Sequence, residues 1–599
     1  MPQIIRTFIS PEEVFPGRSV DYAELSGLAS TLNRDEALHF LGFLNLLLSS
    51  ATIETEFTNN VEPVRDVQTW LIREVISEKL LRTLQAQFGA ASLLNRPLLH
   101  RTQLLFVTRL VATWGRADGG NRLQTRDDFD VIGDLLFLTN GLFRVEEPPS
   151  KKATALWLAT QMGPMHETEN PPAIEISWPR VHDLFTRRLP AAAADPADLE
   201  RLERIALFTT GFSMEAWLDL SFLLFSFWSA VTFKQLMADR SRGYLNPDQP
   251  HETISKEVLL QALASLSTPF AELPDRLKIE SFSRTTLFDL TPFRASPLWI
   301  MPNGDALCID VALLVERLGA HAFWSVMNAL DTMARRKQFT STWGSAFEAY
   351  CLDRLDKIFR ARNWFFVPNP LDESSNEELW DAVAVRDGAA IVIECKGTFI
   401  KSGDKYSGEP AAFFRGLTQK FGHVKHGGLY QLRSGIEAVW FNQTAKSSIR
   451  GLRAVEDIYP VLVVQDPIIN AGPVMRVLSD RFLRSMEPRL KVGHPKVWPL
   501  TVMTADALDR LSAVIQVTGE RLDSILKSFH RAHPSRMISL EEFMAPNGDR
   551  FNTEAVRAII KGRFDVIAEA AMQRFRNGDY GGTGRDEPGT VDQEKARGT

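Results

Sequence analysis

One stretch of the sequence, residues 378–397, places charged side chains around an apolar run. It reads ELWDAVAVRDGAAIVIECKG, with Asp381 before the run and Glu394 and Lys396 at its end. Charges in a buried strand are costly unless something pairs them. Carboxylate oxygens are the ligands that Mg²⁺ prefers, and an ammonium beside a bound metal can orient or help deprotonate a water. The stretch therefore indicates metal-assisted hydrolysis of a phosphodiester.

The turn between the two halves of this stretch fixes which residues face each other. Asp387-Gly388 is a two-residue hairpin signal. Asp381 lies six residues before this pair and Glu394 six residues after it, so the two carboxylates are expected directly opposite each other. Lys396 shares their face, and the alternate residues point to the other face: Ile391, Ile393 and Cys395. Like charges opposite each other destabilise a sheet, which favours a cation between them.

A helix before the hairpin carries a further acid. Residues 341–359 are expected to be helical, because apolar residues recur at helical spacing: Trp343, Phe347, Cys351, Leu355 and Ile358. Ser341 or Thr342 is the expected N-cap. Glu348 lies at the edge of this apolar stripe, so it can approach the sheet.

These residues resemble the PD-(D/E)XK, or restriction-endonuclease-like, nuclease superfamily. The matching motifs are Asp381 and the tripeptide Glu394-Cys395-Lys396 at a strand end, with helical Glu348 upstream. The first signature reads Trp-Asp here where the family has Pro-Asp. The resemblance covers roughly residues 340–510, under a third of the chain. It implies a central mixed β-sheet flanked by helices and a Mg²⁺- or Mn²⁺-dependent nuclease, most simply a DNA endonuclease.

The resemblance also implies roles for single residues. Asp381 and Glu394 are the expected metal ligands, with the carbonyl of Cys395 as a candidate further ligand. Lys396 has the water-activating role, and Glu348 is an auxiliary ligand or supports the ligands. Some members carry an active-site glutamine on the helix after the core, and the stretch GLYQLRSGIEAV (428–439) makes Gln431 the candidate.

The segment that follows the motif is basic. From Lys396 to Arg433 the sequence has seven lysines and arginines against two acids, in a chain of net charge −6. Such residues hold phosphates by charge without reading sequence. The expected nucleic-acid contacts are Lys401, Lys405, Arg415, Lys420, Lys425 and Arg433. A solvated helix face would account for the same run.

The length of 599 residues predicts several domains. The expected fold is multidomain α plus α/β, with a large helical N-terminal region and a C-terminal restriction-endonuclease-like domain. The expected strands lie at 364–368, 379–385, 389–397, 459–465 and 496–503, with helices over 411–442 and 504–530 between or after them. The expected divisions are a helical region (1–195), a helical region ending in a β-hairpin (296–310) and a helix (196–335), the nuclease-like domain (336–530), a helical extension (531–576) and a disordered tail (577–599).

Composition excludes some classes and leaves others open. The three cysteines show no metal-ligand spacing, which suits a reducing compartment. The apolar segment 220–233 is shorter than the ~20 residues of a membrane span and is expected to be a buried helix. The N-terminus lacks a signal-peptide pattern, and no P-loop motif or GxSxG is present. We therefore expect a cytoplasmic protein without a membrane partner.

Three alternatives remain open at this stage. The charged residues could form a solvated strand end, or the nuclease fold could be an inert scaffold that binds nucleic acid or proteins. An RNA-cleaving effector is the third. The helical region would serve target recognition, regulation, self-association or contact with a partner subunit. By analogy alone, such an arrangement suggests restriction, antiphage defence or DNA repair.

Overall fold

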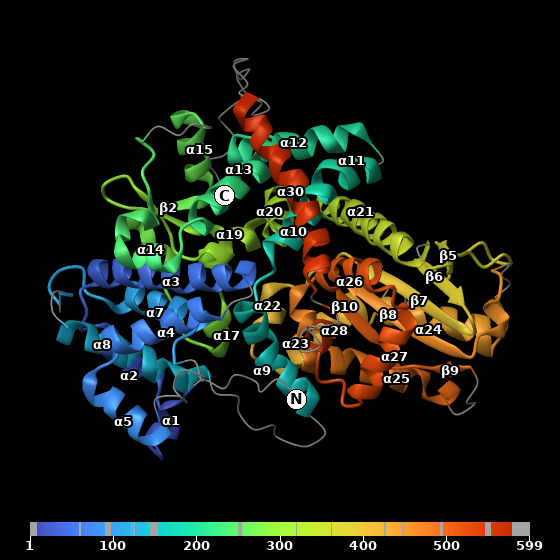
Figure 1. Cartoon of the computed structure of the whole chain (residues 1–599), viewed down its shortest axis with the longest axis horizontal. Helices are drawn as coiled ribbons and strands as arrows, with labels where there is room; N and C mark the ends of the chain where they lie inside the picture. Colours follow the sequence, from blue (N-terminus) through green and yellow to red (C-terminus); the bar gives the residue numbers. More distant parts are fainter. Residues whose placement is uncertain are drawn as a thin grey trace.

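The computed structural model describes residues 9–577, apart from 59–60, 90–97, 121, 124–125, 144–153, 194, 250–253, 319, 361, 424–426, 446–448, 491–494, 545–550 and 552. The described chain is mostly helical and contains two mixed β-sheets. Figure 1 shows the helical region on the left and top and the larger sheet, with its flanking helices, on the right. The predicted combination of a helical region with an α/β region is thus confirmed. The expected tail lies outside the described residues, except that Asn577 ends a helix.

The first part of the chain is built from helices whose apolar faces pack on one another. Asn33 opens a long buried helix by accepting a hydrogen bond from the backbone N–H of Glu36 at 3.1 Å. The helices up to the larger sheet are α1 Pro11–Val14, α2 Tyr22–Ala29, α3 Arg34–Thr58, α4 Glu62–Glu74, α5 Glu78–Phe88, α7 Arg101–Trp114, α8 Arg126–Thr139, α9 Thr154–Glu169, α10 Ile174–Asp183, α11 Leu189–Ala192, α12 Pro196–Thr210, α13 Met214–Ser229, α14 Phe233–Ala238, α15 Lys256–Leu266, α16 Leu273–Leu277, α17 Arg284–Phe288, α18 Thr291–Ala295, α19 Val311–Leu318, α20 Ala320–Ala329 and α21 Met333–Arg360.

Two of these helices are strongly apolar. The segment 220–233 is mostly part of α13 and is largely buried, as predicted. The second is α3, which the sequence also predicts, because Asn33 is an N-cap signal before the apolar run ALHFLGFLNLLL (37–48). Among the described residues, its portion Arg34–Thr55 is long and apolar enough to cross a membrane, and 78% of the tested window is buried inside the protein. Burial of this extent is typical of a helix in a protein core.

A small four-stranded sheet lies within the helical region. Its strands are β1 Tyr244–Leu245, β2 Ser267–Pro269, β3 Leu298–Ile300 and β4 Ala306–Cys308, in the order β1-β4-β3-β2. β3 and β4 form the predicted hairpin, with Gly304 at a φ of 89° in the turn. The hairpin prediction is confirmed, whereas the short flanking strands β1 and β2 carry too few residues to show a pattern in the sequence.

The larger sheet has six strands. They are β5 Phe365–Pro368, β6 Ala382–Arg386, β7 Ala389–Lys396, β8 Asp457–Val464, β9 Lys496–Val497 and β10 Thr501–Thr504. The main order is β10-β8-β7-β6-β5, with β9 also paired to β8. β5, β6 and β7 are antiparallel, and β7, β8 and β10 are parallel. Each predicted strand is present, and the segment 496–503 forms two strands because Trp498–Leu500 interrupts it.

Alternate residues of this sheet enter two different cores. Ile391, Ile393 and Cys395 of β7 pack in the core that also contains α21 and α26. Val392 and the other residues of the opposite face pack with α23, α24 and α25. The helices that complete the α/β region and the C-terminal extension are α22 Ser402–Lys405, α23 Pro410–Phe421, α24 Gly428–Ile436, α25 Gly472–Leu490, α26 Ala505–Thr518, α27 Leu522–Ala532, α28 Leu540–Met544 and α30 Glu554–Asn577.

Packing joins the two regions closely. The first core is one cluster of buried residues, drawn from positions between Ile9 and Phe575, and it includes residues of both regions. α9 packs against α25 and α23, and α30 crosses over α10 and α26 (Figure 1). Two expected boundaries fall inside helices, because α21 begins at Met333 and α27 continues to Ala532. Consequently Ser341 and Thr342 are interior to α21, and the prediction that one of them caps the helix was wrong.

Candidate active site

The hairpin that carries the predicted site has the predicted register. Asp387 and Gly388 have φ values of 47° and 75°, as a two-residue type I′ turn requires. Ala382 pairs with Ile393 and Arg386 with Ala389. Asp381 is the residue before Ala382, so it lies at the position opposite Glu394. The local turn chemistry therefore brings the two carboxylates together.

Backbone hydrogen bonds hold Asp381 at the end of β6. Its Oδ2 accepts a hydrogen bond from the N–H of Cys395 at 2.6 Å, and its carbonyl oxygen accepts one from the N–H of Asn369 at 2.8 Å. The preceding Trp380 is buried and stacks on Trp440, with ring centroids 5.6 Å apart. Burial raises the pKa of Asp381, although the charge of Lys396 and the Cys395 hydrogen bond act in the opposite direction.

Glu394 and Lys396 form a direct ion pair on the same face of β7. Lys396 Nζ lies 2.5 Å from Glu394 Oε1. Glu394 is fully buried, and its Oε2 has no hydrogen-bond partner among the described residues. Burial raises the pKa of Glu394 to about 8, with a contribution from the charge of Asp381 and opposition from Lys396. Burial alone would lower the pKa of Lys396, but Glu394 and Asp381 outweigh it and raise that pKa.

Two further acids complete the cluster. Carboxylate oxygens of Glu348, Glu378 and Asp381 all lie within 4.8 Å of one another. Burial raises the pKa of Glu348 to about 7, and the charges of Asp381 and Glu378 add to this shift. Partial loss of solvent around the carboxylate and the charge of Asp381 raise the pKa of Glu378, although the residue as a whole is exposed. Glu348 thus lies where the sequence placed it, whereas Glu378 was missed.

Glu378 lies in the chain that leads into β6. This chain runs back along the segment after β5, where Glu378 forms an isolated bridge with Leu371 and the N–H of Leu379 donates to the carbonyl of Pro370 at 2.9 Å. The one sequence signal for Glu378 is that it is an acid three residues before Asp381.

The structure brings α24 against the cluster. A Cβ atom at Gly428 would lie 2.6 Å from Leu462 Cδ1, 3.2 Å from Glu394 Cγ and 3.4 Å from Lys396 Cγ, so only glycine allows this approach. Gln431 lies one turn further along the same helix, and its Oε1 is buried with no hydrogen-bond partner within the described chain.

The side chain of Cys395 points away from the acids. It is buried on the other face of β7 beside Cys351 of α21, and the hydrogen bond with that thiol, together with burial, raises its pKa well above the usual value. Both cysteines are core residues, as the sequence predicted. The thiol of Cys395 therefore cannot be a metal ligand at this site, and only its backbone carbonyl is a candidate.

Four of the six predicted phosphate-binding residues lie at the surface or are partly exposed. Lys401 and Arg415 are exposed, although Arg415 Nη2 lies 2.6 Å from Asp404. Lys420 and Arg433 are half-buried, and burial together with the nearby charge of Lys401 lowers the pKa of Lys420.

Two of the six do not belong with these residues. Lys405 is buried, with Nζ 2.9 Å from Glu167 and 2.7 Å from Asp466, so the prediction of a phosphate contact there was wrong. Its charge is already neutralised inside the protein. Lys425 lies outside the described residues.

The acids have the donor set of a divalent-cation site. Glu348, Glu378 and Asp381 offer carboxylate oxygens within 4.8 Å of one another, and Glu394, ion-paired with Lys396, lies at the position opposite Asp381 on the neighbouring strand. Oxygen ligands of this kind suit Mg²⁺ or Mn²⁺. The unpartnered Oε2 of Glu394 fits a cation, because buried polar atoms in native proteins are almost always paired.

A comparison with known proteins adds no assignment. No family model matches the chain, and a search of the curated proteins finds no match either.

Proposed function

We propose that this protein is a metal-dependent nuclease, most simply a DNA endonuclease, whose active site is the acidic cluster around Lys396. The observation that carries the proposal is the convergence of Asp381, Glu394 and Lys396 on one face of the hairpin, with an unpartnered carboxylate oxygen on Glu394. A structural ion pair would not need the additional acids Glu348 and Glu378.

Asp381 would hold the metal together with Glu348 and Glu378, whose oxygens lie within 4.8 Å of one another. Glu394, with its unpartnered Oε2, would be the ligand from the neighbouring strand, and the Cys395 carbonyl is a candidate further ligand. A bound divalent ion would polarise the phosphate and lower the pKa of a coordinated water. Asp381 is held in place by the N–H of Cys395, so the protein fixes one carboxylate before any ligand arrives.

Lys396 is placed to act on the same reaction. Its raised pKa keeps the side chain an ammonium at neutral pH, with three N–H donors. One donor bonds Glu394, which leaves donors for a water or a phosphate oxygen. In this role Lys396 orients the nucleophile and offsets negative charge that develops on the phosphate.

Cations beyond the cluster would bind the rest of the polyanion. Lys401 is exposed five residues after Lys396, and its charge is felt by Lys420 on α23. Arg415 is exposed on the same helix. Such contacts favour the phosphate backbone and carry no sequence preference of their own.

The test is a cleavage assay with the full chain on supercoiled plasmid, single-stranded DNA and structured RNA, in Mg²⁺, Mn²⁺ or EDTA. We expect metal-dependent nicking or linearisation of plasmid and at least a 100-fold slower rate for Lys396→Ala. Lys337→Ala, an exposed lysine eleven residues before Glu348 on α21, is the control and should cleave normally.

Other outcomes distinguish the alternatives. Preferential cleavage of RNA would favour the RNA-cleaving effector. Binding of nucleic acid without cleavage in either metal would favour the inert scaffold. Equal cleavage by wild type and Lys396→Ala would remove Lys396 from the mechanism.

A further inference from the structure

The loop that leaves the candidate active site is held by a buried carboxylate from the neighbouring strand. Lys396 pairs with Val464 at the end of β8, and Asp466 follows two residues later. Asp466 Oδ2 accepts a hydrogen bond from the N–H of Ile400 at 2.7 Å, and Oδ1 accepts one from the N–H of Ile468 at 3.2 Å. Asp466 therefore fixes the chain four residues after Lys396.

Asp466 is in turn held by the helical region. Its side chain is fully buried and lies 2.7 Å from Lys405 Nζ, which also lies 2.9 Å from Glu167 Oε1. Glu167 belongs to α9, more than two hundred residues earlier in the chain. The hydroxyl of Tyr406 donates to the other oxygen of Glu167 at 3.2 Å. Three buried side chains thus connect α9 to the backbone of the active-site loop.

The chain of ion pairs continues into the helical region. Arg294 donates to the Tyr406 hydroxyl at 2.9 Å and bonds Glu316 at 2.5 Å. Glu316 lies 2.9 Å from Arg101, which also pairs with Asp310. Buried ion pairs contribute little net stability compared with apolar packing, but removal of one partner leaves a buried charge. Any other arrangement of the two regions would separate these partners and leave buried charges unpaired.

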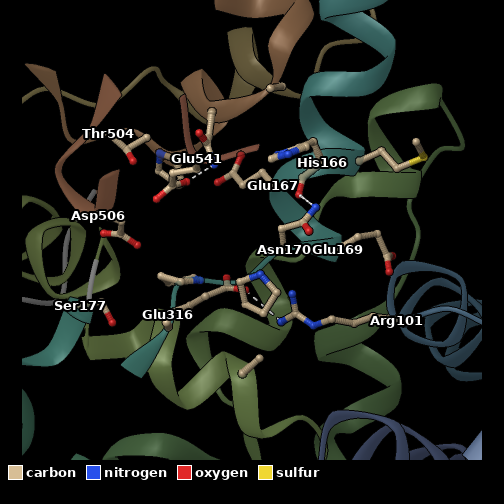
Figure 2. Close-up of a pocket in the computed structure, with 18 of the residues that line it drawn as sticks. Arg101, His166, Glu167, Glu169, Asn170, Ser177, Glu316, Thr504, Asp506 and Glu541 are labelled. Carbon is tan, nitrogen blue, oxygen red and sulfur yellow. Dashed lines mark hydrogen bonds and ion pairs between the residues drawn. The ribbon is translucent and has the colours of Figure 1, made fainter. Parts of the chain in front are cut away.

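One side of this network borders a large cavity between the two regions. The cavity has a volume of about 2560 Å³, and its lining includes Arg101, Glu167, Glu316 and Lys405. Figure 2 shows side chains of α9, Arg101 and Glu316 projecting into the same space as Glu541 and Asp506 of the other region. Apolar packing therefore does not enclose the ion pairs on the side of the cavity. On that side the ion pairs themselves hold the two regions in position.

We propose that Glu167, Lys405 and Asp466 are positioning residues for the candidate active site, acting through the Ile400 N–H on the loop that leaves Lys396. This inference rests on the proposed function, because it assigns to Glu167 of α9 a role in positioning the end of β7, which carries Glu394 and Lys396. The helical region then contributes directly to the geometry of the site.

The test compares Glu167→Ala with Arg180→Met in the full chain. Arg180 makes ion pairs between the same regions, with the buried Asp509 at 2.9 Å and with the half-buried Asp506, and no interaction of its side chain with the loop is seen among the described residues. Hydrogen exchange is measured on the peptide that contains Ile400, together with kcat and KM for plasmid cleavage. For Glu167→Ala we expect at least tenfold faster exchange and a kcat lowered about tenfold, with KM within about twofold.

Glu167→Gln retains an oxygen acceptor for Lys405 and should recover at least half of the lost kcat and protection. Unchanged exchange in Glu167→Ala, or equal changes in Arg180→Met, would overturn the proposal. The exchange measurement requires no catalysis. If the wild-type chain cleaves nothing, the proposed function fails by itself, and the exchange comparison still decides whether Glu167 positions the loop.

Discussion

Glu394 carries a buried carboxylate oxygen that lacks a hydrogen-bond partner among the described residues. The residue is fully buried, and its pKa is raised to about 8. Buried carboxylates without a partner are costly, and proteins retain them where a ligand or a reaction uses them. A divalent cation would satisfy this oxygen and offset the repulsion from Asp381.

Glu378 provides a test at the same scale, because it belongs to the cluster but is exposed. Glu378→Gln should weaken Mn²⁺ binding about tenfold while changing the free energy of unfolding by less than about 0.5 kcal/mol. Glu377→Gln, the exposed neighbour, is the matched control and should bind Mn²⁺ like wild type. Calorimetric titration and urea denaturation measure the two quantities. Equal affinity in all three proteins would exclude Glu378 from the site.

The site residues differ in how far the sequence could predict them. Asp381 and Glu394 could be matched because a two-residue turn fixes the register of the hairpin. Glu378 could not, because its place depends on backbone hydrogen bonds between the segments around Pro370 and Leu379. Lys405 was misjudged because its partners, Glu167 and Asp466, are distant in the sequence.

Among the elements, α24 approaches the site closely enough to require a glycine. A Cβ atom at its first residue, Gly428, would lie 3.2 Å from Glu394 Cγ and 3.4 Å from Lys396 Cγ. The sequence predicted a helix here, and it also predicted where the strands of the larger sheet lie. Both predictions rest on apolar patterns within short stretches of the chain. The sequence did not predict that α21 begins at Met333, since polar residues at its start continue the helix without an apolar stripe.

Gly428→Ala tests this contact. The added Cβ would press on Leu462, so the helix must shift away from β7. We expect a loss of about 1–3 kcal/mol in the free energy of unfolding, and slower cleavage because Glu394 and Lys396 move. Gly403→Ala in α22 meets no atom within 4 Å and should behave like wild type. Thermal unfolding and the plasmid assay measure both effects, and a stable, fully active Gly428→Ala protein would contradict the described approach of α24.

At the scale of the whole molecule, the larger of the two cores contains residues of both regions. Apolar residues from Ile9 to Phe575 form a single cluster, and Arg180 and Glu167 add ion pairs across the junction. The sequence predicted several domains from length and composition, which do not report contacts between distant segments. The expected divisions stay a prediction, and a denaturation experiment tests them.

Shared packing predicts joint unfolding. In thermal denaturation, far-ultraviolet circular dichroism and tryptophan fluorescence should follow one coincident transition, because buried tryptophans lie in both regions, among them Trp178 and Trp380. Two separated transitions would show that the α/β region unfolds independently of the helices that cover it.

The central claim is that Asp381 and its neighbours form a divalent-metal centre, and calorimetric titration of Mn²⁺ tests it most directly. Asp381→Asn keeps the size of the side chain and an acceptor for the Cys395 N–H but removes the charge. We predict that the wild-type chain binds Mn²⁺ and that Asp381→Asn binds at least about tenfold more weakly. No binding by the wild-type chain, or the same affinity in both proteins, would contradict the account.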